Sequence, residues 1–113
     1  MRIEQSVLIK VTRVAETLGW RVTHTNGEFE FQKYSPAGQD FYVNVIAETP
    51  YELRKELRER SDYFDCSEET HIWLDETGHG KNGAPYDMKD LYEDMEACEN
   101  MLGELAEAIK EVT

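Results

Sequence analysis

The chain has few cysteines, few basic residues and no long hydrophobic run, and each scarcity excludes a class of protein. Its 113 residues include two cysteines, Cys66 and Cys98, which are too few for a disulfide framework, so we expect free thiols. No apolar stretch approaches the length of a membrane span, and the first residues lack the basic and then apolar profile of a secretion signal. We therefore expect a cytoplasmic protein that does not bind a membrane.

Basic residues are scarcest in the second half of the chain. The sequence has 12 Lys and Arg against 24 Asp and Glu, which gives a formal net charge of −12. Residues 62–107 contain only two basic residues, Lys81 and Lys89, so the surplus of acidic residues lies in this stretch. Such a field repels nucleic acid and attracts basic surfaces. The expected partner is a basic protein, with no direct binding of nucleic acid.

Length and composition indicate a folded protein. A chain of 113 residues can bury a core without metal or disulfide crosslinks. The aromatic content of 11% argues against an acidic disordered segment. We expect a single α+β domain over residues 1–113, with an N-terminal helix, a three-stranded antiparallel meander, and then two or three helices packed on one sheet face.

The first half carries one helical pattern followed by alternating patterns. Apolar residues at helical spacing between residues 2 and 18 predict a helix that ends at Gly19. Alternation on both sides of Asn26-Gly27 predicts a β-hairpin, because a type I′ turn needs positive φ at both central residues. The two-residue turn pairs Val22 with Phe31 and places both on one face. The alternation over residues 41–45 predicts a third strand.

Helix signals dominate the second half. Thr49 as N-cap, Pro50 at the first helical position and Glu52 in a capping box predict a helix up to about residue 64. Asp65 is a suitable cap for a short helix that reaches Leu74. Alternate apolar residues over 70–74 also fit a strand, so sequence alone leaves both alternatives open between residues 66 and 74.

The last helix has the strongest periodicity. Its apolar residues follow three-four steps: Met88, Leu91, Met95, Cys98, Leu102, Leu105, Ile109 and Val112. Heptad spacing is compatible with a coiled-coil dimer, but further apolar residues broaden the stripe and favour packing within the domain. A helix ~40 Å long could still associate at its end. We therefore expect a monomer or a homodimer through this helix.

The solvent-facing side of the last helix is the first candidate site. Like charges three or four residues apart each cost a helix roughly 0.2–0.5 kcal/mol, so helix stability does not explain the carboxylates there. They are either a solubilising surface or a substitute for the phosphate backbone in a basic groove. The candidate partner-binding residues are Asp90, Glu93, Asp94, Glu96, Glu104 and Glu107.

The glycine-rich loop at residues 78–85 is the second candidate site. Glycines before a helix can expose amides to an anion, and a lysine would assist. The spacing differs from a P-loop, and nearby acidic residues lack diagnostic metal-ligand spacing. A structured connection is the simpler interpretation, and no metal or cofactor is expected. The candidate ligand-binding residues are His79, Gly80, Lys81 and Gly83.

Nucleophilic catalysis has the weakest support. Cys98 lies on the inward stripe of the last helix, where a free cysteine acts as a small hydrophobic residue. Cys66 has acidic neighbours, which disfavour the thiolate. No Ser-His-Asp spacing stands out in the sequence. We therefore assign no catalytic residue and expect that the protein is not an enzyme.

Three segments carry a resemblance to other proteins: Ser-Pro-Ala-Gly-Gln-Asp-Phe at 35–41, Gly-His-Gly-Lys-Asn-Gly-Ala-Pro at 78–85, and Asp-Met-Glu-Ala-Cys at 94–98. In these segments the chain resembles a group of small acidic proteins of unknown function found among mobile-element genes of gut Firmicutes. The resemblance covers most of the chain from Trp20 onward and brings no activity or site residue with it. It implies a mobile-element origin, which favours an inhibitor or mimic.

These observations favour a non-catalytic acidic interaction module that occupies a basic surface of a nucleic-acid-binding protein. The alternative is a protein, either an enzyme or a binding protein, that binds a small ligand, an anion or a metal at the Gly78–Pro85 loop.

Overall fold

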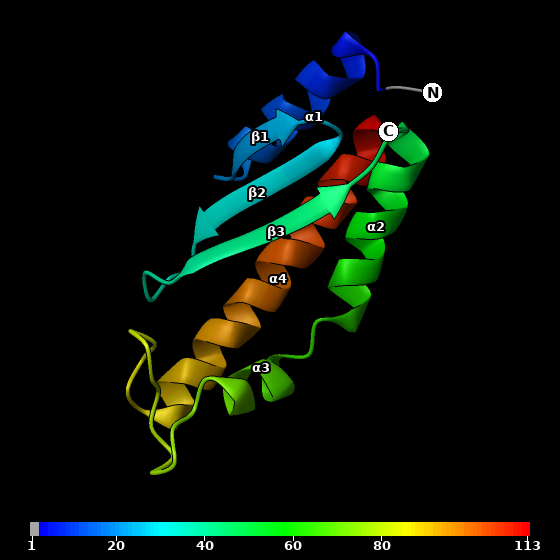
Figure 1. The fold of residues 1–113 in the computed structure, drawn as a ribbon. Coiled ribbons are helices and arrows are strands. Elements are labelled where there is room, and N and C mark those ends of the chain that lie inside the picture. Colours follow the sequence, from blue (N-terminus) through cyan, green and yellow to red (C-terminus); the bar gives the residue numbers. More distant parts are fainter. Residues whose placement is uncertain (1–2) are drawn as a thin grey trace.

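The computed structural model describes residues 3–113 and confirms the α+β fold (Figure 1). In chain order the elements are α1 (Gln5–Thr17), β1 (Arg21–Thr25), β2 (Glu28–Tyr34), β3 (Asp40–Ile46), α2 (Pro50–Tyr63), α3 (Cys66–Ile72) and α4 (Met88–Val112). The predicted start of the first helix at residue 2 lies outside the described residues. The molecule measures 49 × 23 × 22 Å, and α4 follows its long direction.

The antiparallel sheet has the order β1-β2-β3 and the predicted hairpin register. Asn26 and Gly27 have φ values of 51° and 79°, as a type I′ turn requires. Val22 pairs with Phe31, and Phe31 pairs in turn with Val43 of β3. This register places apolar side chains on one face, where Phe29, Phe31, Val43 and Val45 are buried. The hydrophobic pattern and the turn therefore specify the same pairing.

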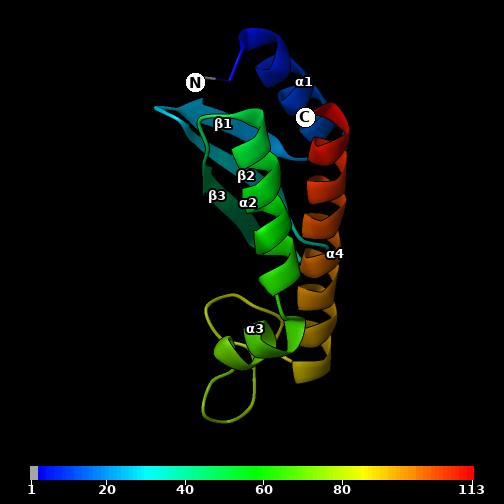
Figure 2. The same cartoon turned by 90° about the vertical axis from the view of Figure 1, so that its right-hand side faces the viewer.

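Helices cover the apolar face of this sheet. Figure 2 shows the sheet and α4 as two layers, with α2 across the side next to β3. The main core joins the sheet to α1, α2 and the C-terminal half of α4, and its fully buried side chains include Trp20, Leu53, Leu57 and Leu105. Packing of the last helix within the domain is thus confirmed. Met88 is an exception, because its side chain is exposed and the buried stripe begins at Leu91.

Local capping fixes the starts of α2 and α3. The Thr49 hydroxyl accepts a hydrogen bond from the amide of Glu52 at 3.1 Å, and the Asp65 carboxylate accepts from the amide of Ser67 at 2.9 Å. The alternatives at residues 66–74 resolve to a helix over Cys66–Ile72, followed by an isolated bridge between Leu74 and Gly80. None of the helices described over residues 3–113 is long and apolar enough to cross a membrane.

Candidate interaction site

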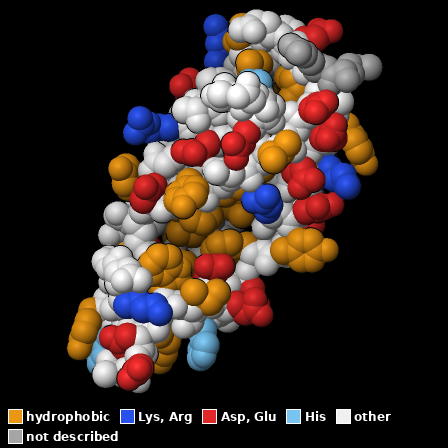
Figure 3. All heavy atoms as spheres, in the orientation of Figure 1, with side chains coloured by type: hydrophobic (Ala, Val, Ile, Leu, Met, Phe, Trp, Pro, Cys, Tyr) orange, Lys and Arg blue, Asp and Glu red, His pale blue; other side chains and the backbone are white. Residues whose placement is uncertain are grey.

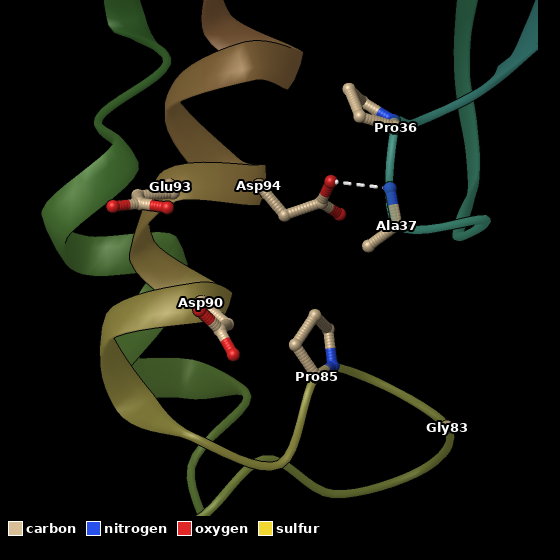
Figure 4. Close-up of a pocket in the computed structure, with 7 residues that line it drawn as sticks. All are labelled: Pro36, Ala37, Gly83, Pro85, Asp90, Glu93 and Asp94. Carbon is tan, nitrogen blue, oxygen red and sulfur yellow. Dashed lines mark hydrogen bonds between the residues drawn. The ribbon is translucent and has the colours of Figure 1, made fainter.

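The β2–β3 turn, the loop before α4 and the N-terminal half of α4 meet at one end of the molecule. Asp94 is the centre of this meeting point, since its side chain points from α4 to the turn (Figure 4). It is only 4% exposed and accepts hydrogen bonds from the Ser35 hydroxyl at 2.6 Å, the Ala37 amide at 2.9 Å and the Gln39 side-chain amide at 2.5 Å. Asp94 therefore fastens the turn to the helix.

The burial of Asp94 corrects the prediction that placed it among the solvent-facing acidic residues. It falls on the three-four steps of the buried stripe between Leu91 and Cys98, and the donors from the turn compensate its burial. That position in the stripe was the signal that could have separated Asp94 from its acidic neighbours. The donors themselves could not be identified from spacing, because Ser35 is 59 residues away.

A cavity of about 510 Å³ lies beside Asp94, between the turn, the loop and α4 (Figure 4). Asp90 and Glu93 also line it, together with Pro36, Ala37, Gly83 and Pro85. Across residues 3–113, no group of three or more His, Cys, Asp or Glu side chains is placed to hold a metal ion. The cavity has an acidic rim formed by Asp90 and Glu93, beside the junction that Asp94 makes with the turn.

The loop at residues 78–85 directs most of its amides inward. The Gly80 amide donates to the Tyr86 carbonyl at 2.9 Å, and the Lys81 amide donates to the Trp73 carbonyl at 3.0 Å. The amides of Gly78, His79 and Ala84 also donate within the loop or to Asp75. These amides are not available to an anion, which favours a structured connection over an anion-binding nest.

The four candidate ligand-binding residues do not converge on one cavity. The His79 ring stacks on Tyr86 with centroids 4.0 Å apart, and its Nδ1 lies 2.8 Å from the Thr77 hydroxyl. The Asp75 carboxylate accepts hydrogen bonds from the Thr77 hydroxyl and from the His79 amide. Both bonds lower the pKa of the Asp75 carboxyl, and the bond from Thr77 has the larger effect. Gly80 packs on Pro85, the Lys81 side chain is exposed, and Gly83 alone of the four lines the cavity beside Asp94.

The other five predicted acidic residues are exposed on α4: Asp90, Glu93, Glu96, Glu104 and Glu107. Five exposed glutamates share one side of this helix, and we call the set the acidic stripe: Glu93, Glu96, Glu104, Glu107 and Glu111. Two of its members have basic neighbours, since Arg58 lies 2.8 Å from Glu107 and Lys89 lies 3.8 Å from Glu93. Exposed ion pairs of this kind are weak, so a partner could displace them. The carboxylates of the stripe therefore remain available to a basic partner.

A second hollow, which the sequence did not predict, lies between β3 and the α2–α3 segment. Figure 3 shows hydrophobic side chains gathered in it, with charged side chains around its margin. Two cavities of about 620 and 410 Å³ share Phe41, Tyr42, Phe64 and Glu69 as lining residues. We call the combined hollow the edge groove; its further lining residues include Trp73, Met95, Cys98 and Leu102.

Cys98, at the base of the edge groove, should make stability sensitive to alkaline pH. Burial, followed by the charges of Asp94 and Glu69, raises the pKa of this thiol from 9.0 to about 12. Between these values the unfolded chain has lost a proton that the folded chain retains. The free energy of unfolding should therefore be fully retained below pH 9 and fall by roughly 1.4 kcal/mol per pH unit above it.

Urea unfolding at pH 8 and pH 10.5 measures this effect, with Cys98→Ala as the matched variant. The variant should lose less stability than the wild type over that interval, because it lacks the titrating thiol. Equal losses in the two proteins would show that Cys98 does not carry the effect.

Comparison of the chain with protein-family models, curated proteins and solved structures gives no match. The charge and shape of the surfaces described above are therefore the basis for assigning a function.

Proposed function

We propose that this protein is a non-catalytic interaction module whose acidic stripe binds a basic surface of a partner protein. The partner class is a nucleic-acid-binding protein, whose basic groove the stripe would occupy as a mimic of the phosphate backbone. The observation that carries the proposal is the exposure of five carboxylates along one side of a 25-residue helix. The resemblance to small acidic mobile-element proteins favours the same class.

The charge density of the stripe suits a basic protein surface. From Glu93 to Glu111 the stripe extends roughly 27 Å at about 1.5 Å per residue, so its five carboxylates lie on average about 7 Å apart. One DNA strand carries a charge per about 3.4 Å. The stripe is therefore a sparser charge array than the backbone it would replace, and we expect strong salt dependence with moderate affinity.

The surroundings of the thiols agree with a reducing compartment. Cys66 and Cys98 are both buried and free. We propose a cytoplasmic location on this basis. The apolar stripe of α4 is buried within one chain, which disfavours a homodimer through this helix.

The test replaces Glu93, Glu96, Glu104 and Glu107 with glutamine. Partners captured from a host lysate by the wild type should bind the variant at least about tenfold more weakly, because several charge-assisted contacts are lost. DNA should compete with the wild type for the same partner. Binding should also weaken between 0.1 and 1 M salt, where the Debye length falls from about 10 to about 3 Å.

A charge-matched control distinguishes the stripe from the net charge. Replacing four exposed glutamates outside α4 with glutamine changes the net charge by the same amount as the stripe variant. This control should bind the partner within about threefold of the wild-type affinity. The four glutamates are Glu4, Glu16, Glu28 and Glu48. Equal weakening by the two variants would reduce the stripe to a solubilising surface, and unchanged binding by the stripe variant would refute the proposal.

A further inference from the structure

The outer side of β3 has an open hydrogen-bonding edge. The amide of Ala47 donates to the Gly27 carbonyl, and hydrogen-bonded pairs then recur at every second residue of an antiparallel ladder. Val43 thus directs its backbone groups to β2, whereas Tyr42 and Asn44 direct theirs away from the sheet. Within residues 3–113, no other segment forms a backbone hydrogen bond with Tyr42 or Asn44. Such an edge is a template for another strand.

The edge groove lies directly beside these open backbone groups. Tyr42 lines both of its cavities and Asn44 lines the smaller one, while Phe64 lines both and packs edge-to-face against Phe41. The larger cavity, about 620 Å³, is within the range of ligand sites. A strand added to β3 would therefore place alternate side chains into an apolar hollow and the others toward solvent.

The charge of the groove indicates the chemistry of its occupant. Glu69 is half-buried, lines both cavities and forms no ion pair among the described residues. A partly desolvated carboxylate among apolar groups favours a cation beside it. Arg60 lines the smaller cavity but lies beyond the 4.0 Å limit of an ion pair with Glu69. A lysine or arginine of a ligand could occupy this position.

We propose that the edge groove binds an extended basic peptide segment of a partner protein, which pairs with β3 as a fourth strand. Main-chain bonds to Tyr42 and Asn44 would supply affinity, and apolar side chains in the groove with a cation at Glu69 would supply specificity. A second copy of this chain is a poorer occupant, because each copy carries a net charge of −12. This site is separate from the acidic stripe and does not depend on it.

A blocked heptapeptide is the first probe, with threonine at its odd positions and valine, lysine and valine at positions 2, 4 and 6, so that the two valines and the lysine lie on one side of the added strand. Binding is measured by calorimetry and by tryptophan fluorescence, since Trp73 lines the groove. Two analogues are compared, one N-methylated at its even positions and the other at its odd positions. Only one set of amides can face β3, so one analogue should bind at least about tenfold more weakly and the other like the parent. This comparison uses the wild-type protein and does not depend on the folding of a variant. Equal binding of all three peptides would overturn the proposal.

Tyr42→Pro is the matching change in the protein. It removes an amide that faces away from β2, a position where an edge strand tolerates proline. We expect the variant to bind the heptapeptide at least about tenfold more weakly, whereas Tyr42→Thr, which keeps the amide, should lose less. Glu69→Gln should also weaken binding by about tenfold. Retention of affinity in both Tyr42→Pro and Glu69→Gln would overturn the proposal.

The stripe variant with four glutamines provides the last comparison. It should bind the heptapeptide within about threefold of wild type, since the groove is unchanged. Loss of peptide binding in that variant alone would place the peptide on the stripe and overturn the groove proposal. The wild type could instead form a dimer that Tyr42→Pro dissociates, and fail to bind the peptide. That result would assign the β3 edge to a second copy of the chain and would also overturn the peptide proposal.

Discussion

Replacing Asp94 with alanine should lower the free energy of unfolding by about 3 kcal/mol, because three buried or partly buried donors lose a charged acceptor at once. For a domain of this size, the melting temperature should fall by on the order of 10 °C. Asp94→Asn should cost less, since an amide oxygen can still accept one of these hydrogen bonds. Urea unfolding and thermal melting followed by circular dichroism measure both variants.

Glu96→Ala is the control on the same helix. Glu96 is exposed and forms no ion pair in the part of the chain that the structure describes, so its loss should change stability by no more than about 0.5 kcal/mol. Hydrogen exchange adds a local measurement, since the Ala37 amide should exchange faster in Asp94→Asn. If Asp94→Ala unfolds at the same urea concentration as Glu96→Ala, Asp94 does not fasten the turn.

Replacing Gly80 with alanine should destabilise the protein by about 3 kcal/mol, near the upper end of overpacking costs. A Cβ at this position would overlap the Pro85 carbonyl oxygen and lie 2.8 Å from the carbonyl carbon. Both atoms belong to the backbone, so the loop would have to open. The hydrogen bond from the Gly80 amide to the Tyr86 carbonyl would then be strained or lost. Urea unfolding measures the loss.

Gly103→Ala is the control for Gly80→Ala. Gly103 lies inside α4, and an added Cβ would make an ordinary contact, 3.7 Å from the Ser61 hydroxyl oxygen. Alanine should stabilise the helix there by roughly 0.5–1 kcal/mol, because glycine loses more backbone entropy on folding. The two Gly→Ala substitutions should thus have opposite signs. A Gly80→Ala variant as stable as wild type would show that the loop tolerates the side chain.

The order of the elements could be predicted because their signals are local. Asn26-Gly27 determines the hairpin, since positive φ at both residues selects one turn and that turn fixes the pairing of Val22 with Phe31. Thr49 and Asp65 determine two helix starts, because each caps amides two or three residues away. The choice between helix and strand at residues 66–72 stayed open in the sequence, because the apolar residues there fit both periods, and the structure decides it with a helix capped by Asp65.

Tertiary structure decided the features that join distant segments. The sequence showed Asp94 as one carboxylate among many, and only the approach of the β2–β3 turn makes it a buried acceptor. The glycine-rich loop had the composition of an anion site, but its amides are used by Trp73, Tyr86 and the loop itself. The edge groove combines residues of β3, α2, α3 and α4, and no local periodicity encodes such a hollow. Hydrogen-bond partners and cavity walls arise when separate segments pack, whereas turns and caps arise within a few residues.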